Sequence, residues 1–433
     1  MKKRHLVAAS LLLCLEGTAF SQTSPNNDPF LKEPSRSAPW LLDWGGGISL
    51  AGVFENNTVS EEPSLDEGLG TNLWLRLSLP LGWQSFFRVK DSLSLPLLPR
   101  RDSGLELSHE WELNAAYVQW TYPIEGVLIA VGRKPFSLGS GIALKGNGDG
   151  LELKLSNPDF RLQVSAFYTG FLNTQFNSYS MNDADEQDGS KRYFGAYSLG
   201  LGLRGHELSL LGMYQSDFTL KAGDIYTSWY SGLQAKGLLF DGDYLLEWIM
   251  ERGRSSNADG NTDIQAYGGL AQYQRFFNTK VKPRISLSYG WASGDPDRTN
   301  SEGSNGNVSG KDAGFQAFGP GLSSLAFAPN FSNLHVIQMA TSISPLSATS
   351  RNKLNLGLNY TYFAKFEKQG LVNGNEAPQN SIDLGHALDA QVQWAPYQDL
   401  SFFIGSGIFL PGAAFHKGES IRYSLSAGLS LSL

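Results

Sequence analysis

The sequence predicts an all-β protein, a transmembrane antiparallel up-and-down β-barrel of about 18 strands. Three observations predict it. Apolar residues recur at every second position over unusually long segments, no uninterrupted apolar run reaches the 18 residues typical of a membrane-spanning helix, and the connections between segments alternate between short and long.

The N-terminus has the features of a secretory signal peptide. Residues 1–5 form a basic segment that contains Lys2, Lys3 and Arg4, and residues 6–15 form a short apolar segment. Ala19 and Ser21 suit the −3 and −1 cleavage positions. Cys14, the single cysteine, lies inside this peptide, so the mature chain is expected to contain no thiol. A lipoprotein site at Cys14 is the alternative, which the large side chain before it disfavours.

Cleavage after residue 21 defines three expected segments. Residues 1–21 are the signal peptide, residues 22–43 are a polar periplasmic lead-in, and residues 44–433 are the outer-membrane barrel. Removal of three basic residues and Glu16 lowers the formal net charge from −7 to −9, which argues against nucleic acid as a partner.

The alternation is clearest at the C-terminus. Apolar residues occupy every second position from Ile421 to Leu433, and small or polar residues stand between them. A typical soluble strand has about 5–6 residues, whereas a strand that crosses lipid needs about 9–11. The same pattern recurs in 73–81, 281–291 and 354–362. Since every backbone polar group must be paired in hydrocarbon, only helices and closed barrels span it, and the sequence favours the barrel.

Eighteen segments are expected to be strands. They are 44–55, 71–81, 83–92, 106–122, 126–134, 149–156, 159–170, 191–204, 206–217, 224–239, 241–253, 263–277, 280–292, 333–345, 352–365, 382–395, 398–410 and 420–433.

The connections between these strands are alternately short and long. The long ones are 56–70, 93–105, 135–148, 171–190, 254–262, 293–332 and 366–381. Outer-membrane barrels have short periplasmic turns and long extracellular loops. The pattern predicts a protein of the bacterial outer membrane, in contact with its lipid, with both termini in the periplasm.

Three segments resemble the alginate export family of outer-membrane channels. The first runs from Ala116-Tyr117-Val118 through Val131-Gly132-Arg133-Lys134-Pro135-Phe136 to Asp149-Gly150-Leu151. The second is Tyr289-Gly290-Trp291-Ala292-Ser293-Gly294-Asp295, and the third joins Leu384-Gly385-His386-Ala387-Leu388-Asp389 to the segment 405–412. The resemblance implies an 18-stranded barrel that passes an anionic polysaccharide, and it favours a monomer.

A barrel of this size encloses a water-filled lumen unless loops plug it. On strands whose phase is clear, nine cations are predicted to point inward: Arg76, Arg88, Lys90, Lys154, Arg161, Lys282, Arg284, Lys353 and Arg422. Four anions are predicted to do so: Glu152, Glu247, Glu251 and Asp389. Such a wall concentrates anions. The alternative for each arginine is that it braces the wall by pairing with a carboxylate.

Arg133 and Lys134 lie on a strand without a clear phase. Arg133 is the favoured solute contact, because the predicted loop 135–148 follows directly. That loop either folds inward as a constriction or is an ordinary mobile loop. The candidate lumen residues are therefore Arg76, Arg88, Lys90, Arg133, Lys134, Arg161, Lys282, Arg284, Asp389 and Arg422.

The sequence predicts a porin for anionic solutes, carboxylated sugars or an exopolysaccharide such as alginate among them. The alternative is a structural or adhesin-like barrel with a blocked lumen. No enzymatic role is expected, because the histidines lie in no catalytic signature. No cofactor and no metal are expected, and Asp295 with Asp297 is interpreted as a solvated turn rather than a calcium site.

Overall fold

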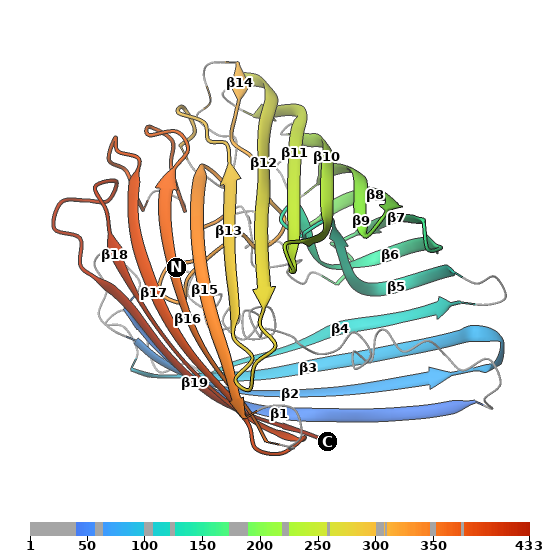
Figure 1. The fold of residues 1–433 in the computed structure, drawn as a ribbon. Helices are drawn as coiled ribbons and strands as arrows, with labels where there is room; N and C mark the ends of the chain where they lie inside the picture. Colours follow the sequence, from blue (N-terminus) through green and yellow to red (C-terminus); the bar gives the residue numbers. More distant parts are fainter. Residues whose placement is uncertain are drawn as a thin grey trace.

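The strands form one closed antiparallel ring, which confirms the predicted fold class. The computed structural model describes residues 40–56, 64–98, 107–121, 126–172, 189–218, 225–257, 260–299, 307, 310–346, 352–373 and 376–433. Each strand of the wall pairs with the next strand of the wall, and the first also pairs with the last, so the ring closes. Figure 1 shows the ring with its steeply inclined strands.

The ring contains 18 strands, and one further two-residue strand, β14, pairs parallel to β12 from inside a loop. The strands are β1 (Leu41–Asn56), β2 (Ser64–Ser78), β3 (Trp83–Leu98), β4 (Ser108–Trp120), β5 (Val127–Leu138), β6 (Leu144–Ser156), β7 (Phe160–Tyr168), β8 (Arg192–Leu203), β9 (His206–Asp217), β10 (Ile225–Leu239), β11 (Gly242–Asn257), β12 (Gly260–Phe276), β13 (Arg284–Ala292), β14 (Lys311–Asp312), β15 (Leu334–Leu346), β16 (Lys353–Lys365), β17 (Asp383–Ala395), β18 (Leu400–Pro411) and β19 (Arg422–Ser432). A single 3₁₀ turn, Pro80–Gly82, joins β2 to β3.

All eighteen predicted strands are present, with corrected ends. The predicted loop 135–148 is wrong in extent, because β5 continues to Leu138 and β6 already begins at Leu144. The predicted loop 254–262 is likewise mostly strand. The first strand begins at Leu41, inside the expected lead-in 22–43. The signal peptide 1–21 and the lead-in up to residue 39 lie outside the described residues.

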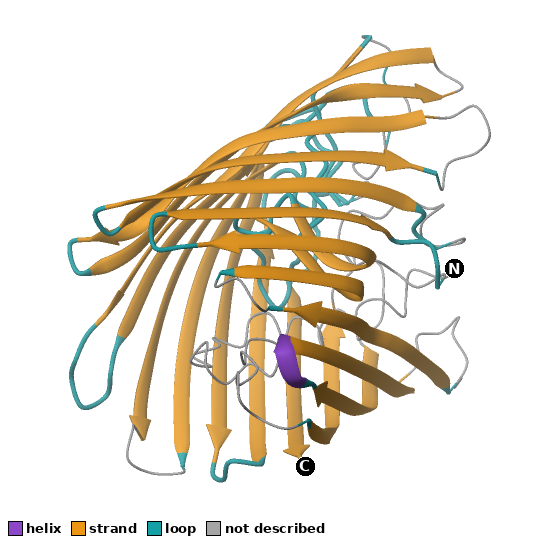
Figure 2. Cartoon of the chain, turned by 90° about the vertical axis from the view of Figure 1, so that its right-hand side faces the viewer, coloured by secondary structure: helices purple, strands orange, loops and turns teal. Residues whose placement is uncertain are grey.

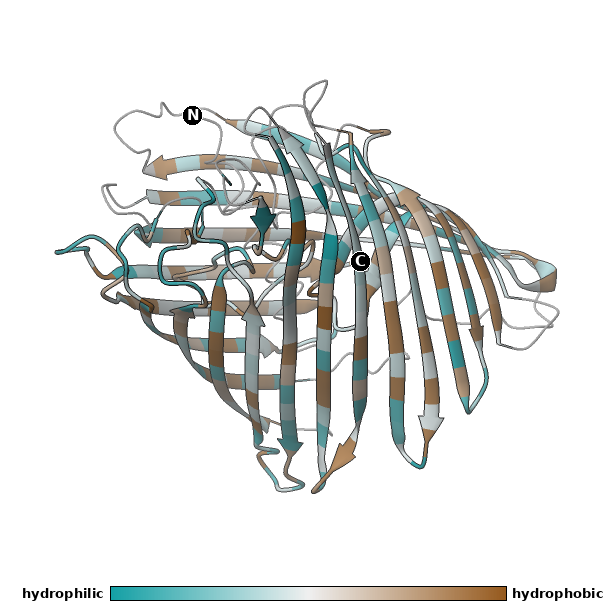
Figure 3. Ribbon diagram, turned by 90° about the horizontal axis from the view of Figure 1, so that it is seen from above, coloured by the Kyte–Doolittle hydropathy of each residue, from teal (hydrophilic) through white to brown (hydrophobic). Residues whose placement is uncertain are grey.

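Side chains alternate between an apolar exterior and a small or polar interior. On β19, Leu425 and Leu429 are exposed on the outside, whereas Ser424 and Ser426 are buried on the inside. Figure 3 shows brown and teal alternating along the strands in this way. No helix within the described ranges is long and apolar enough to cross a membrane.

The wall is interrupted where β5 and β6 leave it. β5 pairs with β4 only as far as Arg133, and β6 pairs with β7 only from Asp149 onward. Between these points β5 and β6 pair with each other alone. Residues 134–148 therefore form a two-stranded hairpin that has left the ring, and we call it the inward hairpin. Gly132, with φ of +125°, lies at the bend, where a side chain would be strained.

Candidate functional site

The inward hairpin packs over the inner face of the wall from β7 to β11. At its tip, the backbone N–H and the hydroxyl of Ser140 both donate to Glu247, at 2.7 and 2.6 Å. Gln234 of β10 donates to the same carboxylate at 2.6 Å. Because Phe136, Leu138 and Leu144 are almost fully buried, the hairpin is packed inside the barrel. The sequence left the position of residues 135–148 open, and the structure places the hairpin inside the barrel, against the inner face of β7 to β11.

A second element, the described residues 293–299 and 310–333, also folds into the lumen, and we call it the inward loop. Figure 2 shows loop segments (teal) within the ring of strands. The hairpin and the loop bond to each other: Lys145 N–H donates to the carbonyl of Phe318, and Phe318 N–H donates to that of Ala143. Gly319 approaches so closely that a side chain there would collide with the Gly141 carbonyl.

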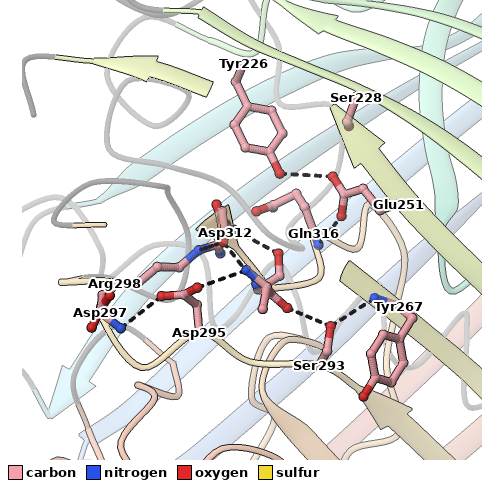
Figure 4. A network of polar contacts seen from close by, with 12 residues as sticks. Tyr226, Ser228, Glu251, Tyr267, Ser293, Asp295, Asp297, Arg298, Asp312 and Gln316 are labelled. Atoms are coloured by element: carbon pink, nitrogen blue, oxygen red, sulfur yellow. Dashed lines mark hydrogen bonds and ion pairs between the residues drawn. The ribbon is translucent and has the colours of Figure 1, made fainter. Parts of the chain in front are cut away.

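A polar network holds the base of the inward loop (Figure 4). Arg298 donates to both oxygens of Asp312, at 2.8 and 2.7 Å, and to the Gly314 carbonyl. Burial alone would lower the pKa of Arg298, but the adjacent Asp312 carboxylate raises it above its ordinary value. The bidentate contact of Arg298 with Asp312 therefore fixes the fold of the loop.

Asp295 belongs to the same network. Its carboxylate accepts the backbone N–H groups of Asp297 and Ala313, both at 2.9 Å, and the residue is buried. The interpretation of this acidic pair as a solvated turn is therefore wrong for Asp295, which caps the loop backbone. Over the described part of the chain, no three His, Cys, Asp or Glu residues are grouped to hold a metal ion.

Aromatic side chains join the hairpin, the wall and the loop into one apolar cluster. Phe136 stacks on Phe167 with ring centroids 4.1 Å apart, Phe167 stacks on Phe194 at 5.0 Å, and Phe194 meets Phe318 edge-on at 5.2 Å. The cluster continues through Phe327 to Phe409 of β18. Among the described residues it draws on β5 to β18 and includes none from β19 or from β1 to β4. One side of the lumen is thus filled by fixed elements.

Three inward carboxylates of the wall anchor these elements. Besides Glu247, Glu251 accepts the backbone N–H of Gln316 at 2.9 Å and the hydroxyls of two tyrosines of β10. Asp389 accepts the backbone N–H of Leu325 at 3.0 Å and the Asn359 amide. These are three of the four anions that the sequence predicted to point inward, and each ties a wall strand to the inward hairpin or the inward loop.

The predicted cations Arg76, Arg88 and Lys90 lie on the lumen face of β2 and β3, near a smaller buried cluster of Phe86, Ala115 and Tyr117. Arg76 forms an ion pair with Asp43 of β1. Lys90 stands opposite Glu112 of β4 in the strand register. Arg88 is half-buried.

Arg133 and Lys134 stabilise the base of the inward hairpin. Arg133 is 2% exposed, although it occupies a position of β5 at which the alternation directs side chains to the outer face. It donates to Asp149 at 2.8 Å and to the carbonyl of Leu113 at 2.6 Å. Leu113 lies on β4 beyond the last residue that pairs with β5. Lys134 points inward and forms an ion pair with Glu152. For Arg133 the geometry is that of a brace at the bend.

The remaining predicted residues lie at the two ends of the lumen. Arg161 pairs with Glu207 at 2.6 Å, and Arg284 donates to Gln274 at 2.6 Å. Lys282 precedes β13 and is exposed in a turn with φ of +42°, because that strand begins later than predicted. Arg422 is buried and pairs with Glu376 and Glu419 of the extracellular connections.

Several ionic groups inside the barrel were not predicted. The missed carboxylates include Asp43, Glu207 and Asp217, and the missed cations include Lys236, Arg192 and Arg298. Lys236 could have been found, since Trp229 and Leu233 mark the outer phase of its strand. The pair of Arg298 and Asp312 lies in a loop, where no periodicity reveals it.

A closed ring of 18 antiparallel strands with an apolar exterior and a polar lumen defines an outer-membrane β-barrel of the porin class. The sequence profile of the alginate export family matches residues 160–426, more than half of the chain, and the protein belongs to that family. None of the curated proteins matches the chain in sequence.

Solved outer-membrane porins share the fold. OccK9 (OpdG) of Pseudomonas aeruginosa has 13% identity and a TM-score of 0.56, covering 90% of this chain and 98% of that one. OccAB1 of Acinetobacter baumannii has 10% identity and a TM-score of 0.55, covering 93% and 99%. OprD of Pseudomonas aeruginosa has 14% identity and a TM-score of 0.52, covering 93% and 97%. At these identities the likeness concerns the fold alone.

Proposed function

We propose that the protein is a channel for anionic solutes, carboxylated sugars or an anionic exopolysaccharide such as alginate among them. The observation that carries the proposal is the asymmetry of the lumen. The apolar cluster fixes the inward elements against β5 to β18, and the described inner faces of β19 and β1 to β4 add nothing to it. The conduction path follows these faces.

The residues on these faces are small or charged, apart from a separate buried cluster of Phe86, Ala115 and Tyr117 with Trp74. β1 and β19 present small residues inward, including Gly47, Ser49, Ser426 and Ser430. The neighbouring strands contribute Arg76, Arg88 and Lys90. Small side chains leave room for water and sugar, and cations in a low-dielectric channel raise the local concentration of anions. We propose that the channel works as a monomer, which the likeness to the alginate export family favours, and that it has no catalytic role.

Single-channel conductance in a planar bilayer, with the reversal potential measured across a salt gradient, tests the proposal. The wild-type channel is expected to prefer anions and to be blocked by uronic-acid oligomers. The variants Arg88→Gln and Lys90→Gln should reduce the anion preference. Lys417→Gln, in an exposed extracellular connection, is the matched control and should leave it unchanged. Cation selectivity in the wild type would refute the proposal.

A second candidate function is a structural or adhesin-like barrel with a blocked lumen. The specific observation in its favour is that the inward hairpin and the inward loop are bonded to each other and to the wall. Absence of any conductance from protein shown to be folded would favour this candidate over the channel.

A further inference from the structure

Two adjoining hollows lie on the inner wall near the short-turn, periplasmic end of the barrel. The first, of about 390 Å³, is lined by β7 to β10 and their turns. The second, of about 360 Å³, is lined by β10, β11 and β12. They share Lys236 and Gly237 and so lie side by side along β10, and we call the two together the periplasmic groove. Each volume lies within the range of about 300–1,000 Å³ usual for small-molecule sites.

The first hollow carries its cations above a shielded carboxylate. Glu207 accepts from Arg161 at 2.6 Å and from Lys236 at 3.0 Å. The Glu207 side chain is only 17% exposed, whereas those of Arg161 and Lys236 are 63% and 41% exposed. One carboxylate is thus shared by two cations whose tips reach the water of the lumen. A ligand carboxylate can bind both tips without displacing Glu207.

The shape of the first hollow comes from inward positions without side chains. Gly200 and Gly202 follow the inward phase of β8, opposite Arg161 and Glu207. The lining also includes Asp159 and Arg204, so three cations stand against two carboxylates, with a net charge of +1. The wall is therefore concave and weakly positive at this point.

The second hollow offers neutral hydrogen-bonding groups. Gln272 and Gln274 of β12 point into it, beside Asp243 of β11. Arg284 donates to the Gln274 side-chain oxygen at 2.6 Å, which turns the amide N–H₂ of Gln274 toward Asp243 at 3.3 Å. Amide and carboxylate groups at this spacing suit hydroxyl groups, which both donate and accept.

We propose that this groove is a binding site for an acidic oligosaccharide arriving from the periplasm. Arg161 and Lys236 bind a sugar carboxylate, and Gln272, Gln274 and Asp243 bind the hydroxyls of the next sugar residue. The inference rests on the proposed transport of anionic solutes, and it adds a capture site separate from the inward elements. Exposed charge-assisted contacts here raise the concentration of substrate at the mouth of the channel.

The first experiment is calorimetric titration of the folded protein in detergent with a trimer of uronic acid, and with an uncharged hexose trimer as the comparison. The double variant Arg161→Gln/Lys236→Gln is expected to bind the acidic trimer about tenfold or more weakly. Its weak binding of the neutral trimer should not change. Lys353→Gln removes an exposed cation at the same end of the barrel, on the distant strand β16, and is the matched control.

Equal affinity of the double variant and the wild type for the acidic trimer would overturn the proposal. So would an equal loss of affinity in Lys353→Gln, because that would indicate a general charge effect. Block of the channel by the trimer from the periplasmic side, but not by the same addition to the double variant, would support it.

Titration and conductance separate this inference from the proposed function. Binding that is lost in the double variant, together with a wild-type barrel that never conducts, would support the groove and reject the channel. Anion-selective conductance together with unchanged binding in the double variant would reject the groove alone.

Discussion

The bond between Glu247 and the tip of the inward hairpin can be broken without removing the hairpin. Glu247→Ala deletes two hydrogen bonds from Ser140 to a charged acceptor, each worth about 1.5–3 kcal/mol, so the tip loses about 3–6 kcal/mol. At about 1.4 kcal/mol per factor of ten, a locally open tip becomes roughly 10²–10⁴ times more populated.

The apolar packing of the hairpin is larger than this loss. Phe136, Leu138, Ile142 and Leu144 are buried to 4% exposure or less. At about 1.5–3 kcal/mol each, their burial contributes roughly 6–12 kcal/mol. The hairpin as a whole therefore stays in the lumen, while its tip opens locally.

Hydrogen exchange followed by mass spectrometry measures this difference. In Glu247→Ala, the amides of residues 139–141 should exchange faster by roughly two to four powers of ten, while those of β5 before the bend remain protected. Ser140→Ala, which removes only the hydroxyl bond, should give an intermediate effect. In a bilayer, current noise should rise with little change in mean conductance. Unchanged exchange at the tip, or a large and stable rise in conductance, would refute the reasoning.

Three further substitutions test other parts of the structure. Arg133→Ala leaves a carboxylate and a carbonyl at the hairpin base without their donor and should destabilise the barrel by about 3–5 kcal/mol, measured as the shift in unfolding midpoint; Arg133→Lys should recover part of it. Arg298→Ala leaves the buried Asp312 carboxylate without its ion-pair partner, so proteolysis within the inward loop should accelerate while the ring remains folded. Equal protease resistance of the variant and the wild type would contradict the role of this pair in fixing the loop. Leu429→Arg, on the lipid face of β19, should cost about 2–4 kcal/mol, whereas Ser430→Arg on the lumen face should cost far less; equal costs would mean that the phase is wrong.

The ring was predictable because lipid imposes two conditions that the sequence must satisfy everywhere. Outward residues must be apolar at every second position, and every strand must pair on both sides. β19 shows both conditions, with exposed Leu425 and Leu429 and with complete pairing to β18 and β1. Strand ends were less predictable, because the alternation need not continue outside the hydrocarbon. For this reason β13 was predicted to begin too early and Lys282 was placed on it.

The contents of the lumen were not predictable in the same way. Ser140 and Glu247 are 107 residues apart, and Gln316 and Glu251 are 65 apart. No local pattern encodes such contacts. In residues 135–148 the glycines and the proline resemble loop chemistry, yet most of these residues form paired strands that no third strand joins. Alternating apolar residues indicate that a strand contacts lipid, and the inward hairpin does not contact lipid.

The sequence-based charge count was incomplete for a related reason. It missed Asp43, which was assigned to the lead-in 22–43, and Glu207, which lies close to the start of its strand. Both carboxylates bind cations that had been counted as lumen charge, Arg76 and Arg161. The selectivity of the lumen therefore depends on which cations remain accessible above their partners, and Arg161 and Lys236 are two such cations at the periplasmic mouth.

The lumen thus contains two regions with few residues in common. The carboxylates Glu247, Glu251 and Asp389 bind the inward hairpin and the inward loop, and their surroundings are apolar. The cations of β2 and β3 and the periplasmic groove lie outside that cluster. Anchoring and solute contact are therefore separable: removing an anchor should alter the size and the steadiness of the opening, whereas removing a lumen cation should alter which ions pass. A single substitution that changed both the size of the opening and the ion selectivity to the same extent would contradict this separation. It would mean that the inward elements and the lumen cations affect each other through the wall.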